Sequence, residues 1–421
     1  MLTSLVTASC SDKNQAEAPE FSIAVVAPAH FHASLIQKSE IESVDSCVRV
    51  YAPDTAGIEQ YLEAIGAYNS REDNPTHWRT EIHTGADFLE QLREDSISNI
   101  VVLAGNNRHK TRYIAAAIEA GKNVLADKPL AINGEDYALL GRALALAEEK
   151  GLIIRELMTE RFDTLNIVTR RLLNDTVRFG TLVKGSPAAP AISMESNHHF
   201  FKNVSGKPLI RPQWYYDVTQ QGEGIADVTT HLIDLIMWQA FPDSETGPDA
   251  VTVNSASHYP TLISPEQYAR STGYAGGGFP DFLSGAVRDG MLEVFANGSI
   301  DFDINGTNMR IDVRWDYEAP EGSGDTFTAC YRGTKGTVEI IQDASTGYVK
   351  TLYYTPAGSS ERLLIDIPAE ERLGHEDHFN RLTADFLRQF SHAQMADREN
   401  LNTLAKYFIA TTAVEMAGKS K

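Results

Sequence analysis

The chain has few cysteines and no long apolar run in its body. Only three cysteines, Cys10, Cys47 and Cys330, occur in 421 residues, and three are too few for a disulfide framework. No cluster of cysteine and histidine has the spacing of a zinc site, so we expect no metal. Beyond the first residues, no segment provides the roughly 20 apolar residues that a transmembrane helix needs.

Basic side chains are also in short supply. The sequence has 37 Lys and Arg against 57 Asp and Glu, a formal net charge of −20. Nucleic acids and anionic membrane surfaces repel such a chain, so we expect neither as a partner. A hydrophobic content of 42% with 22% charged residues is typical of a globular protein. The length favours two domains over one.

Glycine is missing from the loop where a nucleotide-binding fold needs it most. Residues 22–27 form a short apolar run typical of a central parallel strand. The loop that follows, Ala-Pro-Ala-His-Phe-His at 27–32, contains no glycine. Glycines normally let the backbone approach a pyrophosphate here, and alanine replaces them easily only where φ stays negative. By itself this loop does not indicate a dinucleotide site.

The first residues look like a targeting segment. Residues 1–10 are apolar and rich in small side chains, end in Ala8-Ser9-Cys10, and precede a polar stretch at 11–20. This resembles the end of a bacterial lipoprotein signal, with Cys10 as the lipidated residue. We therefore expect residues 1–20 to lie outside the fold and the protein to be anchored at a membrane facing the periplasm. The alternative is a disordered N-terminus on a cytoplasmic protein.

The next part of the chain alternates between strands and helices. Expected strands are 22–27, 47–52, 100–103, 123–126 and 152–156, and expected helices begin near 29 and cover 61–68, 87–94, 111–120 and 137–150. This alternation indicates βαβ units and a doubly wound parallel sheet. We predict a Rossmann-type domain over residues 21–157.

The pattern changes beyond residue 158. A helix at 163–173 precedes runs rich in aromatic and β-branched residues at 291–295, 299–304, 310–315, 327–331, 337–341 and 350–354. Such runs favour a large, mostly antiparallel sheet. Helices at 379–390 and 401–417 are expected to close the chain. We therefore predict an α+β domain over 158–421, which makes the whole protein an α/β protein of two domains.

Two motifs carry the chemistry. Lys128, followed by Pro129, comes just after the strand at 123–126, and ligands of open α/β sheets bind at the carboxyl ends of strands. Farther on, Asp227 and His231 are four residues apart, so on a helix they share one face. Gly222 and Gly224 precede them and allow close approach at the start of that helix.

These motifs resemble the glucose–fructose oxidoreductase / inositol dehydrogenase / MocA family of nicotinamide-dependent oxidoreductases. The family's Gly-Lys-His-Val-Leu-Glu-Lys-Pro run matches residues 121–129, with Asp127 in the acidic position. The likeness covers nearly all of the chain from Phe21, and is greatest to an exported subgroup with His-Phe-His in the first loop. It implies a dinucleotide-binding domain, and an α+β domain that binds substrate and often joins subunits, hence a homo-oligomer.

The resemblance implies that Lys128, Asp227 and His231 are the catalytic residues. Oxidation of a secondary alcohol needs a base for the hydroxyl proton, and histidine has an intrinsic pKa suited to this task. We assign His231 as the base and Lys128 as the group that binds the hydroxyl. Asp227 is expected to orient His231 or to bind a neighbouring hydroxyl.

The implied cofactor is NAD, with NADP as the alternative. The expected contacts are Ala27, Ala29, His30, Phe31, His32, Asp54, Gly105, Asn106, Asn107, Asp127 and Lys128. Asp54 follows the second strand and could bind the adenosine ribose or cap a turn, while Tyr51 could stack on adenine. Lys110 stands where the family has a histidine a few residues beyond the loop at 104–107.

The expected substrate is a small molecule, a sugar or polyol. Aromatic platforms and hydroxyl-binding side chains are expected from Arg161, His199, Lys202, Arg211, Trp214 and Tyr215. An exported enzyme would have to retain its cofactor, since no free nicotinamide pool is expected outside the cytoplasm. Two alternatives stay open: a glycoside-cleaving enzyme that works by transient oxidation and elimination, and a non-catalytic carbohydrate-binding lipoprotein.

Overall fold

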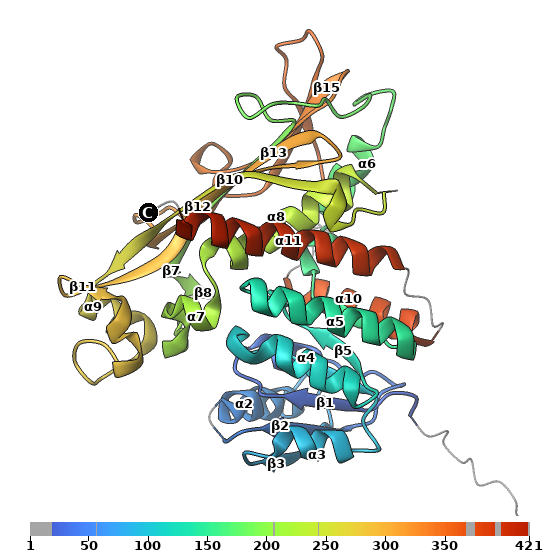
Figure 1. Ribbon diagram of the computed structural model, residues 1–421, viewed down its shortest axis with the longest axis vertical. Helices are drawn as coiled ribbons and strands as arrows, with labels where there is room; N and C mark the ends of the chain where they lie inside the picture. Colours follow the sequence, from blue (N-terminus) through green and yellow to red (C-terminus); the bar gives the residue numbers. More distant parts are fainter. Residues whose placement is uncertain are drawn as a thin grey trace, which may run out of the picture.

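A computed structural model describes residues 19–55, 57–204, 207–242, 244–367, 375–391 and 397–419. Of the expected signal and linker at residues 1–20, residues 1–18, including Cys10, lie outside the described residues. The chain forms two domains stacked end to end, with the N-terminal sheet at the bottom and a long C-terminal sheet at the top (Figure 1). The mixed α/β architecture predicted from the sequence is confirmed.

The N-terminal sheet has six parallel strands in the order β3-β2-β1-β4-β5-β6. The strands are β1 (Ile23–Val26), β2 (Cys47–Ala52), β3 (Arg79–Thr84), β4 (Ile100–Leu103), β5 (Asn123–Ala126) and β6 (Ile154–Glu156). The side chains of β1, β4 and β5 are buried throughout, as expected for strands covered on both faces. The strand order reverses between β1 and β4, which places the ligand site above their carboxyl ends.

The sequence pattern missed β3 because this edge strand is polar and largely exposed. The helices of this domain are α1 (His32–Leu35), α2 (Ile58–Asn69), α3 (Phe88–Glu94), α4 (Lys110–Glu119) and α5 (Gly134–Lys150). Helix α1 is only one turn long, although it stands where a dinucleotide fold normally has its phosphate-binding helix. The attraction of a helix N-terminus for a phosphate is therefore weaker here than in a dinucleotide fold with a full-length first helix.

The C-terminal domain is built on a nine-stranded, mostly antiparallel sheet. Its strands are β7 (Ile192–Phe201), β10 (Val251–Ile263), β11 (Val287–Arg288), β12 (Met291–Ile304), β13 (Thr307–Glu318), β14 (Thr326–Arg332), β15 (Gly336–Gln342), β16 (Thr351–Pro356) and β17 (Leu363–Ile365). A separate two-stranded ribbon pairs β8 (Asn203–Val204) with β9 (Lys207–Pro208). Only the pairing of β13 with β7 is parallel among the described strands of the large sheet.

Strand β7 lies inside this sheet, although the sequence analysis predicted no strand there. It pairs with β13 on one side and β14 on the other. Its histidine, asparagine and glutamate side chains are unusual in a buried strand, so the sequence pattern did not indicate one. The alternate residues Ile192 and Met194 are nevertheless buried. The carboxyl end of β7 therefore delivers polar side chains to the domain junction.

Helices cover one face of the C-terminal sheet. They are α6 (Thr164–Leu173), α7 (Val218–Gln221), α8 (Gly224–Ala240), α9 (Pro265–Thr272) and α11 (Asp397–Lys419). The described 3-10 turns are η1 (Asn107–His109), which precedes α4 in the N-terminal domain, and η2 (Thr159–Phe162), η3 (Gln213–Tyr216), η4 (Pro248–Ala250), η5 (Asp281–Ala286) and η6 (Ala344–Thr346). Helix α8 packs on β12 and β13. Gly224 makes this possible, because a Cβ there would lie 1.9 Å from the carbonyl oxygen of Ala296.

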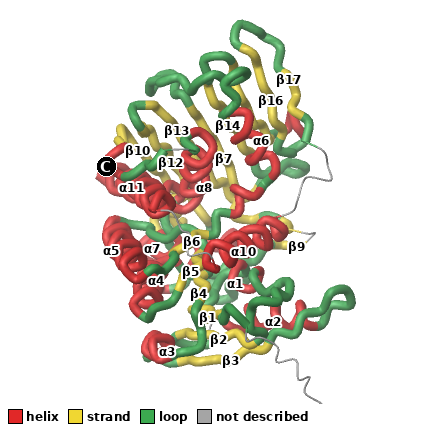
Figure 2. Tube along the Cα trace, turned by 90° about the vertical axis from the view of Figure 1, so that its right-hand side faces the viewer, coloured by secondary structure: helices red, strands yellow, loops and turns green. Residues whose placement is uncertain are grey.

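The last two helices join the domains. Helix α11 lies between the C-terminal sheet and α5 of the N-terminal domain (Figure 1). Helix α10 (His375–Ser391) was expected to close the C-terminal domain, but it packs beside the N-terminal sheet (Figure 2). Phe379, Leu382 and Phe386 are buried in the same core as β1 and β2. The chain therefore returns to its first domain near its end.

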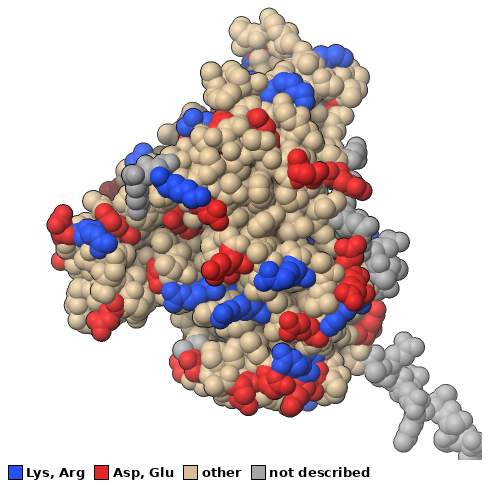
Figure 3. All heavy atoms as spheres, viewed as in Figure 1, with Lys and Arg blue, Asp and Glu red and all other residues tan. Residues whose placement is uncertain are grey.

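None of the described helices is long and apolar enough to cross a membrane. On the face shown in Figure 3, acidic and basic side chains are interspersed, without a broad field of one sign.

Candidate functional site

The Lys128 and Asp227 side chains meet where the two domains join. Lys128 follows β5, Asp227 lies in the first turn of α8, and the Lys128 Nζ donates a hydrogen bond to the Asp227 Oδ1 at 2.5 Å. The Gln221 Nε2 donates to the other carboxylate oxygen at 3.0 Å. Both side chains are mostly buried, with 17% and 7% of the lysine and aspartate side chains exposed. The sequence predicted this meeting of distant residues.

His231 lies one turn farther along α8 but makes no hydrogen bond to Asp227. Its Nδ1 is buried without a partner among the described residues. Burial lowers the pKa of His231 to about 4, and the Lys128 ammonium acts in the same direction. The imidazole is therefore neutral at pH 7 and able to accept a proton. The expectation that Asp227 orients His231 is wrong in this structure, because Lys128 and Gln221 occupy the carboxylate.

The depressed pKa of His231 predicts a pH-dependent stability. Between its ordinary pKa of 6.5 and about 4, the unfolded chain binds a proton at this residue that the folded chain does not. The free energy of unfolding should therefore fall as the pH falls through this window, by up to roughly 3 kcal/mol from this residue. Urea unfolding at pH 7 and pH 4.5 measures the loss. A His231→Gln variant should lose less stability than the parent over the same interval, and an equal loss would contradict the prediction.

Lys110 supports the turn at residues 127–130, which carries Lys128 and is called the catalytic turn below. The sequence did not reveal this role. The Lys110 Nζ donates to the main-chain oxygens of Asp127 at 2.9 Å and Lys128 at 3.3 Å, and to the Asn107 Oδ1 at 2.5 Å. Burial lowers the pKa of Lys110 to about 8. The only signal was that a lysine replaces the histidine of the family here. We interpret Lys110 as a residue that fixes the backbone from which Lys128 projects.

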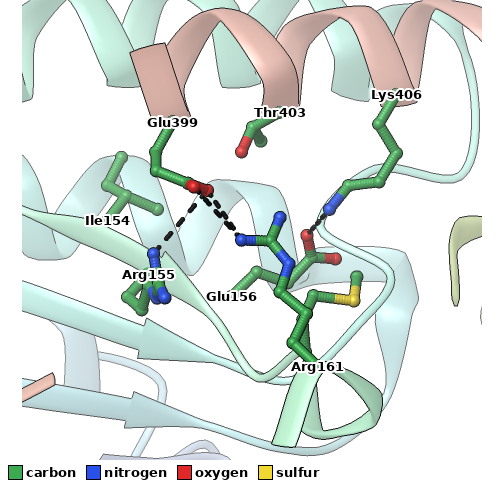
Figure 4. A pocket seen from close by; sticks show the side chains of 8 residues that line it. Ile154, Arg155, Glu156, Arg161, Glu399, Thr403 and Lys406 are labelled. Carbon is green, nitrogen blue, oxygen red and sulfur yellow. Dashed lines mark hydrogen bonds and ion pairs between the residues drawn. The ribbon is translucent and has the colours of Figure 1, made fainter. Parts of the chain in front are cut away.

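A second support comes from α11. The Tyr407 hydroxyl accepts the main-chain N–H of Leu130 and donates to Glu156 at the end of β6. Lys406 bonds to the same glutamate and lies 2.9 Å from an oxygen of Asp234 on α8. Figure 4 shows Lys406 and Glu399 of α11 reaching down to this cluster. These buried groups clamp the catalytic turn, α8 and α11 together.

Arg161, which the sequence analysis expected to bind substrate, has its guanidinium bound to two carboxylates of this clamp. Its Nε and Nη2 each donate to Asp234 at 2.7 Å, and its Nη1 lies 3.1 Å from both oxygens of Glu399 (Figure 4). The side chain is 10% exposed. Burial of two carboxylates around one guanidinium explains why an arginine is needed here.

A cleft of about 560 Å³ runs along the carboxyl ends of β1, β2 and β4. Ala27, Ala29, Gly57, Asn106 and Trp214 are among the residues that line it. This is where dinucleotides bind to doubly wound sheets. The small side chains of the first loop leave its floor open, so the cleft fits the adenosine half of a dinucleotide.

The glycines that the first loop lacks are found in its neighbours. A Cβ on Gly105 would lie 2.5 Å from the carbonyl oxygen of Ala27, and one on Gly57 would lie 2.7 Å from that of Pro28. The loops after β4 and β2 thus pack directly against the first loop. Ala27 itself has a φ of +45°, in the left-handed region that favours glycine. The condition under which alanine would replace glycine easily is not met at this position.

Several expected cofactor contacts have other partners. The amides of Ala29 and His30 donate to the carbonyl of Ala104 at 3.2 and 3.3 Å. The Asn106 side chain donates to the Gln220 Oε1 and that of Asn107 to the carbonyl of Gln221, both at 2.7 Å. The loop after β4 therefore binds the C-terminal domain.

Of the two residues near the end of β2 that were considered for cofactor binding, one is accessible and the other is buried. Asp54 is exposed at the carboxyl end of β2, where a ribose would lie. Tyr51 is 2% exposed, and its ring stacks on His83 at a centroid distance of 4.7 Å. Tyr51 is therefore not free to stack on adenine.

The histidines of the first loop converge on Asp127. His32 Nδ1 lies 2.9 Å and His30 Nδ1 lies 3.4 Å from the Asp127 Oδ2. Burial alone would raise the pKa of Asp127, but His32, His30 and Lys110 outweigh it and hold the carboxyl ionised. Phe31 points outward and is 57% exposed.

Two of the expected substrate residues, His199 and Lys202, form a second polar cluster around Asp325. His199 Nδ1 lies 2.8 Å from one oxygen of Asp325, and Lys202 Nζ donates to the other at 2.7 Å. Arg211 is buried under the end of β7, where it donates to the carbonyls of Phe200 and His199. Its guanidinium therefore holds the strand in place and does not extend into open space.

Tyr215 stands between the two clusters. Burial raises the pKa of its hydroxyl, with Arg211 opposing and Asp227 and Asp325 adding to the rise. Its ring lies under the Arg211 guanidinium, at 4.4 Å from the ring centroid. Trp214, its neighbour, lines the cleft over the N-terminal sheet. Trp214 and Tyr215 thus connect the cleft over the N-terminal sheet with the end of β7.

Family comparisons match both domains. Residues 26–157 match the family described as "Oxidoreductase family, NAD-binding Rossmann fold". Residues 168–364 and 358–418 match a family described as an "oxidoreductase C terminal domain". Among curated proteins, the chain is similar to the "Uncharacterized oxidoreductase YhhX" of Escherichia coli (strain K12), at 30% identity over 126 residues. That alignment covers 30% of this chain and only 32% of the relative.

Solved structures extend the likeness to the whole chain. A crystal structure from Parabacteroides merdae ATCC 43184 is 37% identical, covers 96% of this chain and 99% of its own, and superposes with a TM-score of 0.93. At 13% identity, a 3-ketoreductase from Actinomadura kijaniata in complex with NADP shares the fold with a TM-score of 0.58, over 94% of this chain and 97% of its own. The chain therefore belongs to the Gfo/Idh/MocA family of oxidoreductases expected from its motifs, and its N-terminal domain is an NAD(P)-binding Rossmann domain.

Proposed function

We propose that the protein transfers hydride between a tightly held NAD(P) and a secondary alcohol carbon of a sugar or polyol. The observation that carries the proposal is the 2.5 Å bond between Lys128 and Asp227, beside an unpartnered Nδ1 on His231. A cation and a neutral base meet at the carboxyl edge of the Rossmann sheet, where the family binds its cofactor.

The side chains divide the chemistry between them. NAD(P), when bound in the cleft, supplies the hydride acceptor or donor. Lys128, held by Asp227 and by the backbone contacts of Lys110, donates a hydrogen bond to the substrate oxygen. His231 is neutral and accepts the hydroxyl proton, as general-base catalysis requires. In the reducing direction the protonated imidazole returns that proton to the carbonyl oxygen.

The surroundings support a polyhydroxylated substrate. Trp214 lines the cleft, and Tyr215 adds a second aromatic ring beside it, under the Arg211 guanidinium. Asp325, with His199 and Lys202, offers several hydroxyl-binding atoms. The fold itself does not select sugars, because both the 3-ketoreductase and a biliverdin reductase of Synechocystis sp. PCC 6803 share it.

Retention of the cofactor can be tested directly. We expect the purified protein to release about one dinucleotide per chain on denaturation, because an enzyme that keeps its cofactor through the cycle must bind it tightly. Absorbance at the nicotinamide and adenine bands, with mass spectrometry of the released material, measures it. Protein that is empty and binds no added NAD or NADP would contradict the proposal and favour a carbohydrate-binding protein without catalysis.

Glycoside cleavage by transient oxidation is the second candidate function. Hydride transfer from a sugar carbon to NAD(P)+ gives a ketone and acidifies the neighbouring C–H, so the glycosidic group can leave by elimination as an alcohol. Water then adds to the double bond, and return of the hydride to the ketone restores both the alcohol and the oxidised cofactor, so that the net reaction is hydrolysis. This sequence needs a second proton-carrying group, and the protonated Tyr215 hydroxyl near Asp227 favours it. Cleavage of a nitrophenyl glycoside without net NADH would support this function. Stoichiometric NADH without cleavage would support the simple dehydrogenase.

We also propose that the protein acts at a membrane facing the periplasm, through a lipid on Cys10. The support is the segment at residues 1–10 alone. Labelling with radioactive palmitate tests the anchor, and a Cys10→Ala variant should lose the label and become soluble.

A further inference from the structure

Three side chains of the first loop and the catalytic turn converge on one point. One ring nitrogen of His30, one of His32 and a carboxylate oxygen of Asp127 all lie within 4.8 Å of one another. Both nitrogens approach the same oxygen, at 3.4 Å from His30 and 2.9 Å from His32. Asp127 is 95 residues from His32 in the sequence, so histidine spacing alone could not indicate this cluster.

The His30 Nδ1 and the Asp127 Oδ2 are two acceptor atoms at close range. The main-chain N–H of His32 donates to the His30 Nδ1 at 3.4 Å, so this nitrogen acts as an acceptor. It also lies 3.4 Å from the Asp127 Oδ2, which is another acceptor. A histidine nitrogen has one lone pair, so it cannot donate a hydrogen bond to the carboxylate while it accepts one. A cation that takes this lone pair in place of the long hydrogen bond from His32, and that also binds the carboxylate oxygen, would remove the repulsion between the two atoms.

The donor set has the chemistry of a transition-metal site. Two imidazole nitrogens and one carboxylate oxygen suit Zn²⁺ and other divalent first-row metals. Three protein ligands leave a coordination position open, as in catalytic rather than structural zinc sites. The cluster can be reached from solvent, because the His30 side chain is 30% exposed while that of Asp127 is 7% exposed.

The neighbouring charges indicate what the open position would take. Lys110 lies close by, with its Nζ on the main-chain oxygen of Asp127. Lys128 is compensated by Asp227. A divalent ion beside Lys110 would carry excess positive charge, which an anionic oxygen ligand would neutralise better than neutral water would.

We propose that His30, His32 and Asp127 form a binding site for a divalent transition metal, with one coordination position open to a phosphate or carboxylate oxygen. The site lies beside Lys128 at the carboxyl edge of the sheet. Two of its ligands lie in the loop at residues 27–32, which has no glycine and leads into the one-turn helix α1. A bound cation would therefore take over the phosphate binding that glycines and a helix N-terminus provide in other dinucleotide folds. This inference does not depend on the identity of the sugar substrate.

The test measures metal directly in the full-length protein. Metal content is first determined by elemental analysis of the purified protein, which is then treated with a chelator, dialysed and titrated with Zn²⁺ by calorimetry. We expect about one zinc per chain. Co²⁺ in place of zinc should give visible absorption bands of a site with nitrogen and oxygen ligands. Addition of inorganic phosphate should tighten zinc binding if the open position takes an anion.

Matched variants separate the site from surface binding. His30→Ala, at a partly exposed position, should weaken zinc binding by more than the ~10- to 100-fold that loss of an outer hydrogen-bond partner costs. His77→Ala is the control, because His77 also contacts a single carboxylate, that of Glu40, at 2.7 Å, but on the surface. Zinc binding equal in the parent and His30→Ala, or none in the parent, would overturn the proposal. Neither result bears on hydride transfer, which is assayed separately.

Discussion

Replacement of Lys128 by methionine should lower kcat/KM by roughly 10²- to 10⁴-fold, the range for losing a group that binds or transfers the reacting proton. In the proposed reaction the ammonium contacts the substrate oxygen, and it also neutralises Asp227, which it meets at 2.5 Å. Methionine keeps the length and the apolar stem but removes both functions. Steady-state kinetics with the sugar found by screening measure the loss, and dinucleotide binding should persist because the cleft at β1 and β2 is untouched.

A second variant separates chemistry from folding. Lys128→Met alone leaves the buried Asp227 carboxylate without its cation, which also costs stability. The double variant Lys128→Met/Asp227→Asn removes both charges, so it should recover stability without recovering turnover. His231→Ala should lose activity to a similar degree as Lys128→Met. Turnover within a few-fold of the parent in Lys128→Met and His231→Ala would exclude this site.

Replacement of Lys406 by methionine should lower the free energy of unfolding by about 3–5 kcal/mol, the cost of breaking a buried ion pair from one side. Lys406 is 2% exposed and bonds to Glu156 and Asp234. Without it, the buried Asp234 keeps Arg161 as a cation, whereas the buried Glu156 keeps only the hydrogen bond from the neutral Tyr407 hydroxyl. Urea unfolding followed by circular dichroism measures the change.

The matched control is a charge pair of the same kind on the surface. Arg93 pairs with Glu90 across one turn of α3, and their side chains are 46% and 56% exposed. Arg93→Met should cost less than about 1 kcal/mol, as exposed pairs do. Equal losses in Lys406→Met and Arg93→Met would mean that burial is not what makes the Lys406 contacts important.

Much of the fold could be predicted because its strands follow simple rules. The buried four-residue runs of β1, β4 and β5 were recognised as apolar strands, and their alternation with helices predicted a parallel sheet. The prediction failed where strands are polar. Exposed β3 and the histidine-rich β7 have side chains typical of loops, and only their hydrogen-bonded neighbours make them strands. Helix α10 was assigned to the wrong layer because amphipathicity predicts that a face is buried, not against which sheet.

At the site, short motifs predicted residues that lie close in the sequence, but the sequence did not predict contacts between residues far apart in the chain. The turn with Lys128 and the spacing of Asp227 and His231 could be read directly from the sequence with the family resemblance. The partners of Arg161 and Arg211 could not, because each arginine binds groups that only the tertiary fold brings near. The meeting of His30 and His32 with Asp127 was hidden for the same reason.

The hydrogen bond from the main chain of Leu130 to the Tyr407 hydroxyl joins residues 277 positions apart. A ribosome releases the Rossmann strands first, at roughly 5–20 residues per second, so for some tens of seconds β5 and β6 exist without the helix that completes their edge. During that interval Glu156 has neither Tyr407 nor Lys406 beside it. The catalytic turn is therefore among the first segments of the protein to be synthesised and among the last to be finished, and a nascent chain that stalls before α11 would carry the cofactor domain without a working active site.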